Sequence, residues 1–243
     1  PKATVTDLRK LIQRCDENAE KCNRENRFDK FLKSLKKPEF GKKYSLDPLL
    51  EEKKHHYVLH FIKTENKRHK INLVEESRCR DYLKRKEVKQ QAMAIDGLLC
   101  SLSPEGKRIY GIDGASTEFG NRPEVFAQAF RFLKYKRDNG RYGHLEDCTE
   151  RPLIRATFHA GEDFYDIVDG LRAIDETIKF LNLSEGDRIG HALALGINVN
   201  EFYQSKHKCL MLPKQWFLDN ICWLISHLNK YNLHQFSNFI QYL

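Results

Sequence analysis

The stretch FHAGE at Phe158–Glu162 ends a short apolar run in a histidine, and a glutamate follows three residues later. Gly161, between them, lets the backbone approach a ligand closely. The stretch RIGHA at Arg188–Ala192 again joins an apolar run to a histidine. A metal-activated hydrolase uses an imidazole as metal ligand, a carboxylate that moves a proton, and a second imidazole that orients or deprotonates a water. The two stretches therefore indicate a hydrolytic site.

Apolar runs and helical periodicities alternate along the chain around these two stretches. Predicted strands cover residues 57–62, 109–114, 153–158, 188–193 and 208–212, and predicted helices cover residues 5–35, 75–99, 125–135, 167–181 and 216–228. The alternation predicts a parallel sheet with crossover helices. Asp113, His159 and His191 then lie at or just past the carboxyl ends of their strands, where parallel α/β folds bind ligands.

The two stretches resemble the adenosine deaminase branch of the metal-dependent amidohydrolases, whose fifth and sixth barrel strands end in H-A-G-E and R-I/V-G-H. A third stretch, DGASTE at Asp113–Glu118, resembles the D-L-A-G-D-E turn after the fourth strand, with Ser116 in place of a substrate-facing glycine. The match spans roughly Tyr57 to Leu212. It implies a (β/α)8 TIM-barrel fold, incomplete in this chain, with strands three to seven in residues 56–243 and a basic helical insertion or extension in residues 1–55.

The resemblance also implies an activity, the zinc-dependent hydrolytic deamination of an aminopurine nucleoside or nucleotide. His159 corresponds to a zinc ligand, Glu162 to the group that donates a proton to the purine ring nitrogen, and His191 to the group that orients the attacking hydroxide. Ser116 and Gly161 correspond to substrate-binding positions. Zinc would lower the pKa of its bound water towards about 7.

Each of these residues also has a structural interpretation. His159 would then be a polar residue at a strand end, His191 a histidine satisfied within the core, and Glu162 a cap at a helix N-terminus, where a carboxylate is favoured. Asp113 is expected to be structural, and Glu118 to support its turn rather than touch substrate. The histidines without a partner pattern are expected to have surface or packing roles: His60, His144, His207, His227 and His234.

Two metal-binding motifs of the family are absent from the sequence. The H-x-H of the first barrel strand does not occur, and no Asp-Asp pair follows His191. A single histidine does not hold zinc tightly. We expect the chain to be an internal piece of a longer deaminase rather than a degenerate, metal-free relative. The alternative function is a catalytically inactive barrel that serves as an assembly scaffold, and a second alternative is an amidohydrolase for another amine or amide.

Composition limits the setting of the protein. No apolar run approaches the roughly 20 residues of a membrane span. The first residues lack the pattern of a signal peptide. The seven cysteines form no C-x-x-C pair, which favours reduced thiols and a cytoplasmic protein.

The basic charge is concentrated in the first part of the chain. Residues 1–91 hold 25 Lys and Arg against 15 Asp and Glu. Nucleic acid binding is possible but not favoured, because no aromatic stacking pattern accompanies the charge. Residues 5–50 are expected to pack against a neighbouring subunit of a homo-oligomer or a distant part of the same chain. With such an insertion the chain resembles the large deaminases of bacterial phage-defence systems, which assemble into multi-subunit shells.

Overall fold

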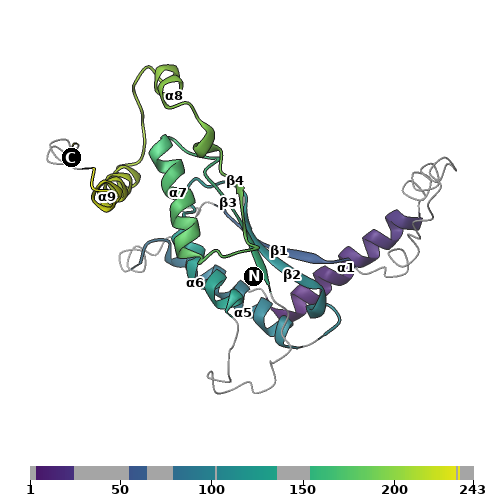
Figure 1. The fold of residues 1–243 in the computed structure, drawn as a ribbon. Helices are drawn as coiled ribbons and strands as arrows, with labels where there is room; N and C mark the ends of the chain where they lie inside the picture. The colour runs from purple at the N-terminus through teal and green to yellow at the C-terminus, as the bar shows by residue number, and fades with distance from the viewer. Residues whose placement is uncertain are drawn as a thin grey trace, which may run out of the picture. The chain divides into compact units, whose positions relative to one another are not determined.

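The computed structural model describes residues 4–24, 55–64, 79–101, 103–135, 154–233 and 235 of the 243-residue chain. It has a mixed α/β fold with a four-stranded sheet and helices between the strands (Figure 1). The chain divides into two compact units. The first comprises Pro1–Val58, Gln90–Tyr110 and Lys136–Leu153, and the second comprises Leu59–Lys89, Gly111–Tyr135 and Ile154–Leu243.

The first unit contains helix α1, Val5–Arg24. Ile12 and Asp16 are two of the residues of this helix that contact other parts of the unit. Ile12 is 1% exposed, and the Asp16 carboxylate accepts hydrogen bonds from Arg108 at 2.8 and 2.6 Å and from the Tyr57 hydroxyl. Helix α1 therefore packs against distant parts of the same chain. Residues 25–35 of the predicted helix lie outside the described residues, and packing against a neighbouring subunit stays a prediction.

The sheet consists of β1 (Tyr57–Ile62), β2 (Ile109–Ala115), β3 (Arg155–Ala160) and β4 (Arg188–His191), in that spatial order. The pairs β2–β3 and β3–β4 are parallel, with Asp113 opposite Thr157 and His159 opposite Gly190. Strands that follow one another in the sequence are thus neighbours in the sheet. The predicted α/β class and four of the five predicted strands are confirmed.

In the second unit, helices α6 (Pro123–Lys134) and α7 (Ile167–Phe180) pack on one another and on β3. Pro123 begins α6 at a position where its missing N–H is not needed. The rings of Phe126 and Phe130 each lie 5.6 Å from that of Phe158 on β3. The helices that follow β2 and β3 therefore cover the same face of the sheet (Figure 1).

Several predicted boundaries are corrected by the structure. Helix α5 begins at Tyr82 and ends at Cys100, after a turn at residues 79–81, whereas residues 75–78 of the predicted helix are not described. Helix α8, Val199–Ser205, was not predicted, and α9 spans Lys214–Lys230.

The strand predicted at residues 208–212 is wrong, because these residues form no regular structure. His207 and Lys208 have left-handed φ angles of 53° and 55°, which an extended strand does not allow. Met211 is 89% exposed, and Pro213 precedes α9. An apolar run without a neighbouring strand to pair with does not form a sheet.

Asp187, just before β4, joins three segments of the second unit. Its side chain is 1% exposed and accepts hydrogen bonds from the Lys134 ammonium and from the backbone N–H groups of Ala156 at 2.8 Å and Ser184 at 2.9 Å. Burial alone would raise the pKa of Asp187, but these hydrogen bonds outweigh it and hold the pKa below its ordinary value. Ionised Asp187 therefore stabilises the start of β4.

We expect Asp187→Asn to lower the free energy of unfolding by about 2 kcal/mol at neutral pH, because a charge-assisted hydrogen-bond set is lost. The folded-state pKa is lowered, so this stability is present above the unfolded-state pKa and is lost as the pH falls through the folded-state pKa. Urea unfolding at about pH 7 and about pH 3 measures the loss of stability and its dependence on pH. The difference between wild type and variant should shrink at the lower pH.

Glu185→Gln is the matched control, since Glu185 is exposed and lies two residues away. Its stability should stay within about 0.5 kcal/mol of wild type. An Asp187→Asn variant that is as stable as Glu185→Gln at neutral pH would contradict the role of this ion pair.

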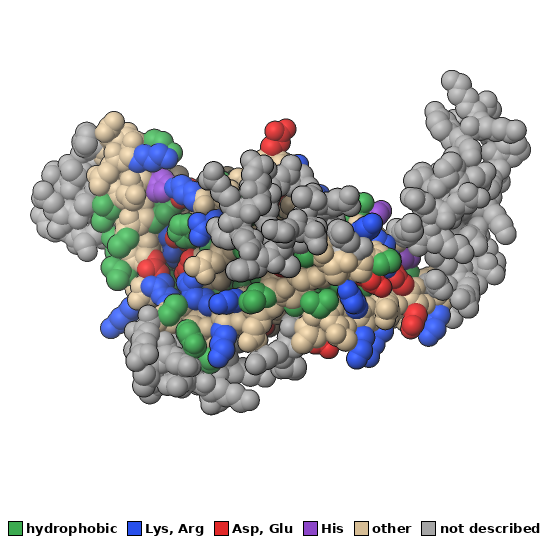
Figure 2. Space-filling model, turned by 90° about the horizontal axis from the view of Figure 1, so that it is seen from below, with side chains coloured by type: hydrophobic (Ala, Val, Ile, Leu, Met, Phe, Trp, Pro, Cys, Tyr) green, Lys and Arg blue, Asp and Glu red, His purple; other side chains and the backbone are tan. Residues whose placement is uncertain are grey.

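None of the helices among the described residues combines the length and apolarity that a membrane crossing requires. On the face drawn in Figure 2, Lys and Arg side chains occur beside acidic and hydrophobic ones. No disulfide joins the cysteines that the structure describes.

Candidate functional site

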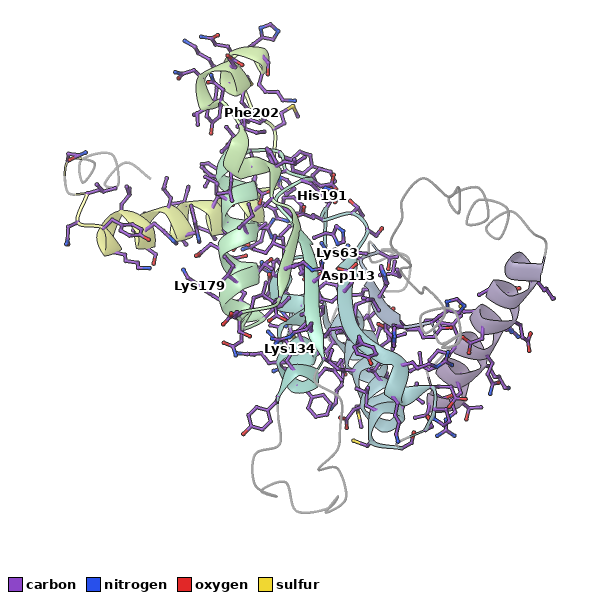
Figure 3. The ribbon with its side chains drawn as sticks, turned by 45° about the vertical axis from the view of Figure 1, so that its right-hand side comes forward. Lys63, Asp113, Lys134, Lys179, His191 and Phe202 are labelled. Atoms are coloured by element: carbon purple, nitrogen blue, oxygen red, sulfur yellow. The ribbon has the colours of Figure 1, made fainter. Side chains whose placement is uncertain are left out.

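The predicted site residues come together at one end of the sheet, in the second unit. His159 is in β3, His191 ends β4, and Glu162 lies in the turn after β3. The rings of His159 and His191 are 5.3 Å apart between centroids, and His191 Nε2 is 3.0 Å from Glu162 Oε2. Figure 3 labels Asp113, Lys63 and His191 towards this end, whereas Lys134 lies towards the opposite end.

The His159 imidazole is held from one side. Its Nδ1 lies 3.2 Å from the Gly114 carbonyl oxygen and 3.2 Å from Asp113 Oδ1. Asp113 Oδ1 is buried without a hydrogen-bond partner among the described residues, so the Nδ1 hydrogen bond goes to Gly114 and the contact with Asp113 is electrostatic. A proton on Nδ1 leaves the Nε2 lone pair available to a metal or a substrate.

Gly190 provides the space for this imidazole. A Cβ added at Gly190 would lie 2.6 to 3.0 Å from three atoms of the His159 ring. Real Cβ atoms do not approach other atoms below 3.0 Å, so any side chain at this position would displace the ring. Gly190 on β4 thus determines where the imidazole of His159, on the neighbouring strand β3, can lie.

The residues that follow β4 have an unusual backbone. His191 and Ala192 have left-handed φ angles of 60° and 50°. Such angles cost a non-glycine residue roughly 1 kcal/mol each, and they persist where surrounding contacts enforce them. Here the Ala192 N–H donates to the Ala160 carbonyl oxygen at 3.1 Å, and the Ala194 N–H donates to that of Gly161 at 2.9 Å. This backbone places His191 beside Glu162.

Glu118 forms a latch between the turns that follow β2 and β3. Its carboxylate, on a residue only 5% exposed, accepts hydrogen bonds from the N–H groups of Gly161 at 2.9 Å, Glu162 at 2.8 Å and Asp163 at 3.2 Å. The Asp163 carboxylate accepts one from the Glu118 N–H at 3.2 Å in return. The sequence-based expectation that Glu118 has a supporting role agrees with these contacts, but Glu118 supports the neighbouring turn as well as its own.

The two predicted substrate-binding positions share a left-handed backbone. Gly161 has a φ of 79°, and an added Cβ would lie 2.5 Å from Ile174 Cδ1. Ser116 has a φ of 81°, in the region that favours glycine. Ser116 is therefore a serine with a backbone conformation that is more usual for glycine.

Two residues of the site were missed by sequence reasoning. His60 Nδ1, on β1, lies 3.2 Å from Asp113 Oδ2; the His60 side chain is 49% exposed, which agrees with the expected surface role, but its contact with Asp113 was not expected. Asp113 thus lies between the imidazoles of His60 and His159. Lys63, just after β1, is 1% exposed, and its ammonium donates to the His159 carbonyl oxygen. For Lys63 the available signal was its place directly after the predicted strand 57–62, since the same rule singled out Asp113.

The Lys63 ammonium is surrounded by acidic groups. Burial lowers the pKa of Lys63 to about 8, and nearby carboxylates limit that fall: Glu118, Glu162, Asp113 and Asp163. The ammonium also lies 4.3 Å from the centre of the Phe158 ring. A buried lysine of this kind is costly unless it compensates other charges.

The remaining histidines have mixed outcomes. His227 contacts the Trp223 ring at 4.0 Å between centroids and lies 3.6 Å from Asp175, which agrees with a packing role. His207 is exposed, and His144 and His234 lie outside the described residues.

His159 fits a zinc ligand, because its Nδ1 is held and its Nε2 has the lone pair. The described residues do not complete a zinc site, since no group of three or more His, Cys, Asp or Glu side chains among them is arranged to hold a metal ion. His191 and Glu162 contact each other. Further ligands would have to come from outside the described residues.

No protein-family model matches this chain, and no curated protein matches it.

Proposed function

We propose that this protein is a metal-dependent hydrolase that deaminates an aminopurine nucleoside or nucleotide. The observation that carries the proposal is the convergence of His159, Glu162 and His191 at the ends of two adjacent parallel strands. A carboxylate beside two imidazoles provides groups that can donate and accept protons.

We further propose that the sheet is part of a (β/α)8 barrel. Two features of the second unit support this assignment. The order of the strands in the sheet is the same as their order in the sequence. Helices α6 and α7 pack on the same face of the sheet. A doubly wound sheet reverses its strand order and carries helices on both faces, whereas a barrel keeps its helices outside and its strands in sequence.

The residues of this chain then have distinct roles. His159 would bind zinc through Nε2, together with ligands outside the described residues. Zinc, when bound, supplies a water acidic enough to act as hydroxide at neutral pH. Glu162 donates a proton to the ring nitrogen of the purine, which makes the amino-bearing carbon more electrophilic. His191 orients the attacking oxygen and stabilises its charge.

The substrate would be contacted mainly by backbone. Ser116, in the turn after β2, is exposed and has a left-handed backbone, whereas Gly161, in the turn after β3, is buried and its N–H donates to the Glu118 carboxylate. The Glu118 latch keeps these two turns together. A flat purine bound there would meet the Glu162 carboxylate from one side.

The test is an assay of the protein at its full natural length with zinc. Adenosine-type nucleosides and their phosphates are offered separately, and ammonia release is measured with the absorbance change of the purine. We expect ammonia from at least one aminopurine and loss of the activity when a chelator removes zinc.

Two results would overturn the proposal. A zinc-loaded protein that releases no ammonia from any aminopurine would favour the inactive scaffold. Release of ammonia only from other amines or amides would assign a different substrate class to the same residues.

A further inference from the structure

We propose that Lys63 is a positioning residue of this site, which fixes the turn from His159 to Asp163 and thereby the Glu162 carboxylate. The inference rests on the proposed function for its catalytic consequence, but the structural part stands on the contacts of Lys63 alone.

Lys63 connects the ends of three strands. Its backbone N–H donates to the Ala115 carbonyl oxygen, at the end of β2, at 2.8 Å. Its ammonium donates to the carbonyl oxygen of His159 on β3. One residue just after β1 therefore fixes the end of its own strand relative to the ends of β2 and β3.

The ammonium is also the counter-charge of the acidic groups in these turns. The Glu118 carboxylate accepts hydrogen bonds from the Glu162 and Asp163 N–H groups, and the Asp163 carboxylate accepts one from the Glu118 N–H. The carboxylate-bearing residues Glu118, Glu162 and Asp163 are therefore close together. Carboxylates gathered at one end of a sheet repel each other unless a cation offsets them. Lys63 is 1% exposed, and its ammonium lies 4.3 Å from the centre of the Phe158 ring. Coulombic attraction to nearby carboxylates offsets part of the effect of burial on the pKa of Lys63: Glu118, Glu162, Asp113 and Asp163.

A lysine that only filled the core would be replaced without cost by an apolar side chain of similar length. The contacts indicate a different role, because removal of the ammonium leaves the His159 carbonyl oxygen without this donor and leaves the carboxylates uncompensated. None of the contacts that Lys63 makes with the described residues places it against substrate, so we expect it to act through Glu162 and the backbone.

The experiment compares Lys63→Met with Lys63→Arg and with Lys134→Met in the protein at its full natural length. Lys134 is the matched control, because it is a lysine with an 11% exposed side chain that donates to a carbonyl oxygen and a carboxylate away from the site (Figure 3). The first readout is hydrogen exchange of the Gly161, Glu162 and Asp163 amides, and the second is kcat and KM for the aminopurine that the wild type deaminates.

We expect Lys63→Met to speed exchange of these three amides by about 10-fold or more while amides of α6 keep their wild-type rates. It should lower kcat on the order of 10-fold or more and leave KM within about threefold, because Lys63 positions a group that reacts rather than one that binds. Lys63→Arg should recover part of both losses, since it keeps the charge and a donor. Lys134→Met removes a partner of buried Asp187 and should lower global stability, but it should change exchange at residues 161–163 and kcat much less than Lys63→Met does.

Unchanged exchange at residues 161–163 in Lys63→Met would overturn the inference. Equal losses in Lys63→Met and Lys134→Met would also overturn it, because the effect would then be a general loss of stability. If exchange speeds up locally while an active wild type and Lys63→Met share the same kcat, the catalytic part is wrong. A wild type without deaminase activity would refute the proposed function, whereas the exchange readout would still test the positioning of the turn.

Discussion

Glu162→Gln is expected to lower kcat for aminopurine deamination by at least about 100-fold, because glutamine cannot donate the proton that the ring nitrogen takes up. The substitution keeps the size of the side chain. It also keeps the Glu162 N–H that donates to Glu118 at 2.8 Å, so the turn after β3 should stay folded. The measurement is steady-state kcat and KM, together with the zinc content of both proteins, which should be equal.

Glu185→Gln, the same chemical change at an exposed position before β4, is the control and should retain wild-type kcat. If Glu162→Gln turned over the substrate within about threefold of wild type, the carboxylate would be a structural group of the turn. The contact of 3.0 Å with His191 would then be an ion pair without a catalytic role.

Glu118→Ala is expected to lower the free energy of unfolding by about 3 kcal/mol or more. The alanine leaves the N–H groups of Gly161, Glu162 and Asp163 without their acceptor, and an unsatisfied buried donor costs about 1 to 3 kcal/mol. Urea unfolding at neutral pH measures the loss. The same variant should also lose activity, because the turn that holds Glu162 is no longer latched to the turn after β2.

Glu118→Gln provides a graded comparison. Its single side-chain oxygen can accept from part of the set, and its amide faces donors rather than acceptors. Its stability should fall between those of wild type and Glu118→Ala. A Glu118→Ala variant within about 0.5 kcal/mol of wild type would show that the three hydrogen bonds are exchanged for water without cost.

The strands that carry the site were predictable because each is a short apolar run with a local signal. Tyr57–Ile62 forms β1 with the predicted bounds, and β2 differs from its predicted range by one residue. His159 and His191 were identified because each follows such a run. Local sequence fixes which residues end a strand, and parallel strands end on the same side of a sheet.

The sequence could not reveal which polar groups are buried. Asp169 on α7 is 0% exposed and accepts a hydrogen bond from Arg122 at 2.8 Å, a contact across 47 positions of the chain. A charged residue on a helix is normally predicted to face water. Burial of this pair depends on the packing of α6 on α7, which no local pattern encodes.

The apolar residues at 208–212 predicted a strand, but they pair with none of the strands that the structure describes. Whether an apolar run joins a sheet depends on a neighbouring strand, which local sequence does not reveal. The sequence by itself determined the order of strands and helices and the residues at the strand ends, because apolar periodicity and turn residues act locally. Only the tertiary structure decided that Lys63 donates to the His159 carbonyl oxygen, that Glu118 accepts from the backbone of the turn of Glu162, and that Gly190 makes room for the His159 imidazole. These contacts join residues 30 to 100 positions apart, and their energies depend on distance and burial.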